Sequence, residues 1–211
     1  TVTSLSITAH GTDIDETDDI VLDEVSVSTL DLTAGGSVSD IDVDSNDVSS
    51  VKVTGSTKVN AGTNIILNSP SNEFGELDFT AGNKAIIVEN DVVSGKVVAK
   101  SLQVKGTTGI ELKDGSAITS LAASSDSGSI ELLNTGGLSI DDFSTDSDLA
   151  LNGVELKSGT AELGKIDLKT KSPITVNAPI TNSGEGQIIL AALGKEATDD
   201  ITINSSISGD D

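Results

Sequence analysis

The sequence predicts an all-β fold, and more narrowly a parallel β-helix (β-solenoid) with roughly 20 residues per coil. Three observations lead to this prediction: short apolar–polar alternations recur about every ten residues, helix-like periodicity is nearly absent, and large aromatic side chains are almost missing. Alternation over four to six residues places successive side chains on opposite faces, which is the period of a strand. A series of self-similar strands is the signature of a structure built by stacking.

The repeats fall into two groups. The first reads Leu-x-apolar-Thr-Ala, is followed each time by a turn-like pair, and occurs at 5–9, 30–34 and 77–81. The second is a looser apolar-x-apolar tetrad: DIDV at 40–43, SVKV at 50–53, NIIL at 64–67, GIEL at 109–112, SIEL at 129–132, DLAL at 148–151, KIDL at 165–168, PITV at 173–176, QIIL at 187–190 and DITI at 200–203. Thr, Ser, Val and Ile dominate these segments, as strands prefer, and Gly, Asn, Asp and Ser supply the turns between them.

Sandwich modules are the alternative fold. A sandwich or barrel normally packs aromatic rings in its middle, but this chain has three aromatic residues, Phe74, Phe79 and Phe143, and no Trp or Tyr. Hairpin turns of the Asn-Gly or Asp-Gly kind are also few. We therefore expect one repeat-built domain over residues 1–211, which buries Val, Ile, Leu and Ala in thin layers.

The charge of the chain excludes some partners. The formal net charge is −22, Arg is absent, and the strongly acidic N-terminal third, residues 1–50, holds twelve Asp or Glu and no Lys. Binding to nucleic acid without sequence preference needs Lys and Arg to displace counterions, and anionic lipid headgroups also attract basic segments. We expect neither partner. No run of residues approaches the ~20 apolar residues of a membrane span.

Calcium is the metal that the acidic segments suit best. Segments 12–19 and 40–47 concentrate hard oxygen ligands, with the candidates Asp13, Asp15, Asp18, Asp40, Asp42 and Asp44. If 40–44 is a strand with Ile41 and Val43 inward, its acids line a solvated outer face. The alternative is that Ca²⁺ bridges this face, within or between molecules, and relieves the repulsion among its carboxylates. No other cofactor is expected.

Catalysis is not expected. His10, the sole His, takes a turn position filled by Gly35 and Gly82 in its sister repeats, and a lone His without Cys cannot build a closed zinc site. The enzymatic rival is a polysaccharide hydrolase or lyase, which could use two carboxylates across a groove. The absence of Arg, Trp and Tyr argues against such a site.

A family resemblance comes from two phrases, ITVNAPITNSGEGQIILAA at 174–192 and DITINSSISG at 200–209, whose apolar and small polar residues match when aligned. They resemble the repeat region of filamentous haemagglutinin-type adhesins, exoproteins of two-partner secretion in Gram-negative bacteria. The resemblance is clearest over 109–209. It implies a right-handed β-helix, an extracellular location at the bacterial cell surface, and a role as a stalk or adhesive fibre. It carries over no functional residues, and the residues by themselves leave the handedness open.

The expected function is therefore structural, as a segment or subunit of an extracellular bacterial surface fibre or adhesin. Its expected partners are other copies of itself or the rest of a longer adhesin chain, and a host or cell-surface glycan or protein that the sequence does not name. A glycan- or protein-binding module on a β-helix is the alternative, and a polysaccharide-cleaving enzyme is the remote one. Terminal layers of such stacks leave strand edges open, and no capping segment is visible at either end.

Overall fold

The structure, a computed structural model, describes residues 4–9, 19–40, 50–157, 164–196 and 198–209. These residues form an all-β structure with 21 strands and no helix. The strands are β1 (Ser4–Ala9), β2 (Ile20–Val21), β3 (Glu24–Val27), β4 (Thr29–Ala34), β5 (Val38–Ser39), β6 (Ser50–Val53), β7 (Ser56–Ala61), β8 (Ile65–Leu67), β9 (Glu76–Ala81), β10 (Lys84–Glu89), β11 (Val92–Gly106), β12 (Gly109–Ser125), β13 (Ile130–Asn134), β14 (Leu138–Ile140), β15 (Val154–Leu156), β16 (Ile166–Thr170), β17 (Ile174–Val176), β18 (Ile180–Asn182), β19 (Ile188–Ala192), β20 (Ile201–Ile203) and β21 (Ile207–Gly209). In this part of the chain no helix is long and apolar enough to cross a membrane.

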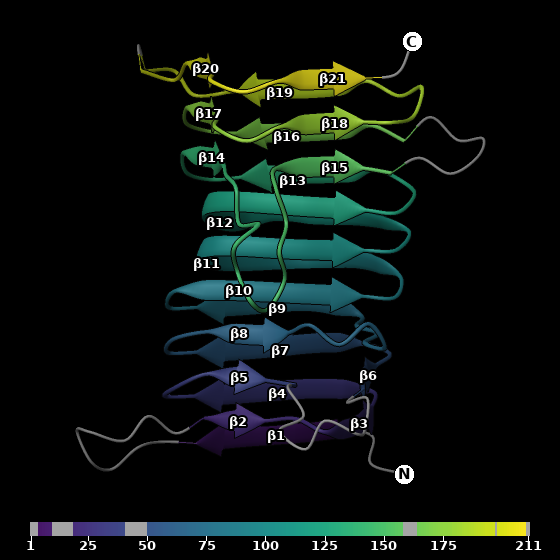
Figure 1. Ribbon diagram of the computed structural model, residues 1–211. Coiled ribbons are helices and arrows are strands. Elements are labelled where there is room, and N and C mark those ends of the chain that lie inside the picture. The colour runs from purple at the N-terminus through teal and green to yellow at the C-terminus, as the bar shows by residue number, and fades with distance from the viewer. Residues whose placement is uncertain (1–3, 10–18, 41–49, 158–163, 197, 210–211) are drawn as a thin grey trace.

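The strands pair in parallel, each with strands from the neighbouring turns of the chain, and so form a column (Figure 1). The first face holds β1, β4, β7, β9, the first half of β11, the first half of β12, β13, β16 and β19. The second face holds β2, β5, β8, β10, the second half of β11, the middle of β12, β14, β17 and β20. On a third side of the column β3 pairs with β6. In the later layers β15, β18 and β21 form a ladder that continues from the end of β12, which itself pairs with the end of β11. We call one passage of the chain around these faces a layer.

The predicted repeats pair with one another. The Leu-x-apolar-Thr-Ala segments lie in β1, β4 and β9, and β1 pairs with β4 so that Leu5 lies beside Leu30 and Ala9 beside Ala34. The two phrases of the family resemblance also lie in adjacent layers, with Ile174 beside Ile201 and Ile180 beside Ile207. The recurrence therefore has a physical reason, because each copy supplies the same ladder position one layer further on.

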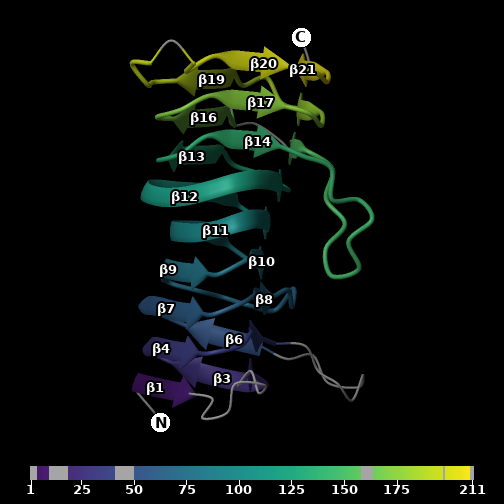
Figure 2. The ribbon, with the colours of Figure 1, turned by 90° about the vertical axis from the view of Figure 1, so that its left-hand side faces the viewer.

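The spacing of the layers along the sequence varies. Lys84 pairs with Ser101, 17 residues later, and Ser56 pairs with Glu76, 20 residues later. Ile130 pairs with Ile166, 36 residues later, because residues 141–153 leave the column between β14 and β15 (Figure 2). The tetrad at 148–151 was predicted to be a strand, and this prediction is wrong, since these residues lie in the irregular excursion.

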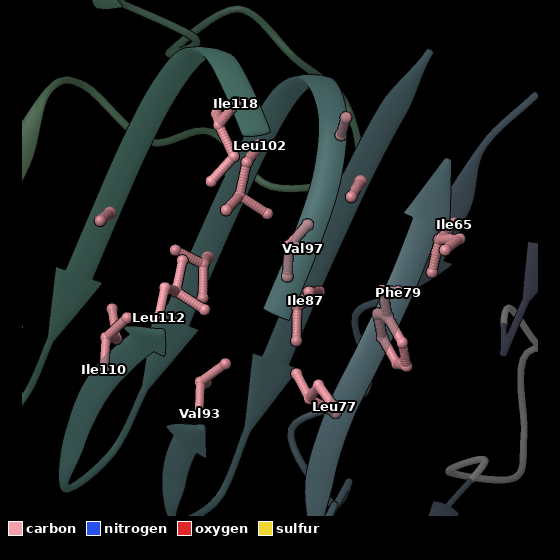
Figure 3. Packing of buried hydrophobic residues seen from close by; sticks show 14 of the residues in the cluster. Ile65, Leu77, Phe79, Ile87, Val93, Val97, Leu102, Ile110, Leu112 and Ile118 are labelled. Carbon is pink, nitrogen blue, oxygen red and sulfur yellow. The ribbon is translucent and has the colours of Figure 1, made fainter. Parts of the chain in front are cut away.

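The core runs through the middle of the column and is almost entirely aliphatic. Figure 3 shows its packing around Leu77, Phe79, Val97 and Leu102, which are at most 1% exposed. Phe74 and Phe79 meet edge to face, with ring centroids 6.0 Å apart. A slim column has room for a few rings only, so β-branched and Leu side chains stacked in register bury most of the apolar area.

Buried Asn side chains complete the hydrogen bonding where the chain turns between faces. Asn134 is fully buried. Its Oδ1 accepts from the Ile118 amide at 2.7 Å, and its Nδ2 donates to the Ile118 carbonyl at 2.9 Å. Nδ2 also reaches the Gly136 carbonyl at 3.0 Å. The side chain thus replaces a missing backbone partner at the corner, where an unpaired buried group would cost ~1–3 kcal/mol.

Candidate functional site

Asp40 is the predicted calcium ligand that falls within the described residues, and it is buried. Its side chain was expected on the outer face, but it is 1% exposed. The assumed register was off by one residue: Val38, two residues earlier, is fully buried, so the strand period turns Asp40 inward as well. The outward prediction for Asp40 is therefore wrong.

Hydrogen bonds from the next layer engage the Asp40 carboxylate. Oδ1 accepts from the Asn68 amide at 3.0 Å, and Oδ2 accepts from the Ser69 amide at 3.2 Å. Asn72 Nδ2 donates to the same Oδ2 at 2.5 Å. Burial raises the pKa of Asp40, and these hydrogen bonds oppose that rise. The carboxylate therefore organises the turn after β8.

The other calcium candidates, Asp13, Asp15, Asp18, Asp42 and Asp44, lie outside the described residues, as does His10. Among the described residues, no group of three or more Asp, Glu, His or Cys side chains is placed to hold a metal ion. Calcium bridging by the five remaining aspartates stays a prediction.

A second buried acid, Glu89, lines a pocket of about 480 Å³ together with Lys52, Glu73 and Asp91. Glu89 ends β10 and is 1% exposed. Its Oε1 accepts from the Phe74 amide at 2.9 Å, while its buried Oε2 has no hydrogen-bond partner. Burial raises the pKa of Glu89 to about 8; the charges of Asp91 and Glu73 add to the rise, and the hydrogen bond from Phe74 opposes it.

A strongly raised carboxyl pKa inside a pocket is a common mark of acid catalysis. In Glu89, however, the oxygen without a hydrogen-bond partner is buried, which argues against a direct contact with a substrate. Glu89 occupies the inner ladder position that Gly106 fills in the next layer. We interpret it as a buried acid that is held protonated at neutral pH and that lowers the stability of the stack when it ionises.

The outer surface of the first face carries ladders of charge. Asp31, Lys58, Asp78 and Lys96 follow one another in register through four layers, with Lys58 3.6 Å from Asp31 and Lys96 3.1 Å from Asp78. Opposite charges placed directly across a pair of strands contribute ~0.2–1 kcal/mol each. The alternation therefore favours this register over a shifted one.

The layer of β19, β20 and β21 exposes apolar residues at positions that are buried elsewhere. Ile201, Ile203 and Ile207 are 40%, 56% and 36% exposed. Their ladder partners one layer earlier, Ile174, Val176 and Ile180, are fully buried. This surface combines the outer edges of β19, β20 and β21 with uncovered side chains, which is the arrangement that a further strand layer would cover.

Two of these features, the burial of Glu89 and the exposed layer of β19, β20 and β21, could not be predicted from the sequence. Glu89 stands in a segment, KAIIVE, that reads as an ordinary strand, and its burial depends on the corner beside Phe74. The layer of β19, β20 and β21, which we call the bare layer, has the same apolar pattern as the layers inside the stack. The acidic stretch DDFSTDSD at 141–148 did interrupt the repeat and could have marked the excursion.

Comparison with known proteins gives one match. A family model described as "Repeats of unknown function (DUF5649)" matches residues 9–81, roughly a third of the chain. No curated protein and no solved structure matches the chain. The matched region begins at the end of β1 and stops at the end of β9, so it includes β4, β7 and the stacked ladders between them. The chain is a repeat-containing all-β protein.

Proposed function

We propose that the chain is a parallel β-solenoid and acts as a structural segment of an extracellular bacterial surface fibre. The parallel ladders along three faces support this fold, with coils of about 20 residues that widen where the chain makes excursions. Nine strands stack along the first face of the described residues. At a spacing of roughly 4.8 Å, they would form a rod about 40 Å long.

The observation that carries the proposal is the bare layer of β19, β20 and β21. Apolar ladder positions continue into it in register and then lack a cover. A structure whose work is to extend by stacking needs such a surface, because its backbone edges and apolar side chains attach the next layer. We propose that this surface accepts a further β-layer, and that a second copy of the chain can supply it.

Charge opposes the association of two copies, since each carries a formal −22. Screening by salt reduces repulsion between exposed charges. The proposal therefore predicts that end-to-end association strengthens from low to physiological ionic strength, whereas association through ion pairs would weaken.

The test compares two substitutions of equally exposed apolar residues. Ile203→Lys places a charge on the bare layer, where the residue is 56% exposed. Val21→Lys places the same charge near the other end, at an outward position that is 59% exposed. Light scattering during gel filtration and negative-stain electron microscopy would measure the lengths of the assemblies. We expect the parent chain and Val21→Lys to form end-joined rods, and Ile203→Lys to form single rods about 40 Å long.

Two outcomes would count against this function. A parent chain that remains single at every concentration and salt level would overturn self-stacking. Equal loss of association in both variants would mean that the effect is not specific to the bare layer, because Val21→Lys changes the layer at the opposite end of the column. Repeating the imaging with calcium and then a chelator tests the acidic segments separately, because calcium bridging predicts that chelation dissolves the assemblies.

A further inference from the structure

Residues 141–153, which we call the strap, leave the column between β14 and β15 and run back along the second face. Figure 2 shows the strap beside the column, descending past β12 and β11 towards the level of β10, and Figure 1 shows it in front of the same strands. Its two limbs are joined near the root, where the Phe143 amide donates to the Leu151 carbonyl at 2.8 Å. Asp142 and Asn152 form an antiparallel bridge.

The root of the strap is held by three successive layers. The Asp141 carboxylate accepts hydrogen bonds from Ser120 in β12, from Ser139 in β14 at 2.7 Å, and from Asn177 just after β17 at 3.0 Å. Partial burial would raise the pKa of Asp141, but these hydrogen bonds outweigh it and lower the pKa. The strap thus leaves the column at a fixed position.

The tip of the strap is held by Lys84, the first residue of β10. Its Nζ lies 2.7 Å from Asp148 Oδ2 and 3.3 Å from Asp146 Oδ2. All three side chains are at most 23% exposed, whereas the ladder pair Lys58 and Asp31 is 56% and 51% exposed. Burial alone would lower the pKa of Lys84, but the hydrogen bonds to Asp148 and Asp146 raise it. Asn68 Nδ2 adds a hydrogen bond to the Asp148 carbonyl at 3.1 Å.

Between root and tip, the strap covers outward-facing residues of the second face. One outward ladder runs from Val21 through Ile86 and Gln103 to Ala122. Val21 is 59% exposed, but Ile86 and Ala122 are fully buried and Gln103 is 1% exposed. Gln103 Oε1 accepts from the Leu151 amide of the strap at 3.2 Å. The strap therefore packs a second, smaller core on the outside of the column.

We propose that the strap acts as a cross-brace, a segment that couples layers that are not adjacent. Because of it, the layers of β8, β10, β11 and β12 unfold locally only together with the layer of β13–β15. Ladder pairing joins adjacent layers, so a plain stack can open one layer at a time. The strap joins its own layer to Lys84, Gln103 and Asn68, which lie 48 to 80 residues earlier in the chain. Opening β10 or β11 then requires the strap to release as well. This inference does not depend on the fibre role proposed above.

Native-state hydrogen exchange of the full chain, followed by mass spectrometry, tests the cross-brace. Lys84→Met keeps the length of the side chain and removes its charge. Its control is Lys58→Met, which removes an ion pair between adjacent layers. For Lys84→Met we expect amide exchange to quicken about tenfold in β10, in β11 and in the strap together, since charge-assisted hydrogen bonds of this kind are lost. We expect no change in β16–β18, and none in β10 or β11 for Lys58→Met.

The cross-brace is refuted if Lys84→Met quickens exchange in the strap alone and leaves β10 and β11 unchanged. If Lys84→Met does not fold, the double variant Asp146→Asn and Asp148→Asn takes its place, because it removes the charges and keeps hydrogen-bonding groups. Gln103→Leu then tests the middle of the strap, and the cross-brace predicts the same coupled response. Independent responses of strap and strands would again refute it.

Discussion

The layer of β16, β17 and β18 and the layer of β19, β20 and β21 contain nearly the same residues in different surroundings. Ile180 and Ile207 share one ladder position, yet Ile180 is fully buried and Ile207 is 36% exposed. Near the other end, Ile20 and Leu22 are only 8% and 4% exposed. The two ends of the column therefore differ, and in the two compared layers burial is set by the neighbouring layer and hardly by the residue itself, so the same phrase is covered in one layer and open in the other.

The largest expected difference comes from truncating the two equivalent isoleucines. Ile180→Ala should lower the free energy of unfolding by ~2–5 kcal/mol, because it leaves a cavity between two layers. Ile207→Ala should cost only about 1–2 kcal/mol, since its side chain is already 36% exposed and its removal leaves no enclosed cavity. Urea unfolding followed by circular dichroism measures both. Equal losses would mean that the last layer is covered in solution.

A second comparison is between a buried acid, Glu89, and an exposed one. Its pKa is raised to about 8 in the folded chain, above the usual value in an unfolded one. Between these two pKa values the folded state binds the extra proton, so stability falls as the pH rises from about 4.5 to about 8. Glu89→Gln should remove this slope and stabilise the chain at pH 8 by ~2 kcal/mol or more. Unfolding curves at pH 5 and pH 8 provide the measurement.

The control for Glu89 is Glu185→Gln, which changes an exposed acid in the layer of β16–β18. It should leave the pH dependence of stability as in the parent chain. If Glu89→Gln keeps the parent's slope, Glu89 ionises normally and its surroundings are wetter than its burial indicates.

A smaller difference in the free energy of unfolding is expected between a buried and an exposed asparagine. Asn134→Ala removes the partner of the buried Ile118 amide and carbonyl, so we expect a loss of ~1–3 kcal/mol in the free energy of unfolding. Asn204 donates to Asn177 Oδ1 at 2.9 Å on an exposed surface, and Asn204→Ala should cost less than about 0.5 kcal/mol. Thermal unfolding of both variants tests this. A larger loss for Asn204→Ala would show that the outer Asn pair, and not the corner, holds the layers together.

The smallest effect is expected on the charged outer surface. Lys58→Met removes the exposed pair with Asp31, at 3.6 Å, and should change the free energy of unfolding by less than ~0.5 kcal/mol at physiological salt. The same variant at low ionic strength should show a slightly larger loss, because screening is weaker there. Denaturation at two salt concentrations tests this, and a loss above 1 kcal/mol would assign the ladder a structural role.

The pattern of repeats was sufficient to predict the all-β class and that the two phrases at 174–192 and 200–209 lie in adjacent layers, because inward ladder positions favour apolar residues in successive layers. The alignment of Ile174 with Ile201 is the clearest case. Pattern alone failed where a segment leaves the column: DLAL at 148–151 alternates as a strand does, but its ends form contacts with Lys84 and Gln103.

The predicted calcium residues show a different limit. The inward or outward direction of Asp40 depended on which neighbour starts the alternation, and one residue of error reverses every side chain. Glu89 shows a third limit, because its raised pKa arises from the corner that packs around it and from acids in two segments. Long-range placement of this kind has no local signature in the sequence.

The most direct test of the account is whether the repeats pair in the register described. The chain has no cysteine, so an introduced pair reports on its own geometry. Thr175→Cys with Thr202→Cys places two thiols at paired positions of β17 and β20, within the Cα separation of ~4.4–6.8 Å that a disulfide requires. Thr175→Cys with Asn204→Cys shifts one partner by two residues, to a diagonal distance of ~7–8 Å. In-register parallel stacking predicts rapid oxidation within one chain for the first pair and little for the second. Equal oxidation of both pairs, or crosslinks formed only between chains, would contradict it.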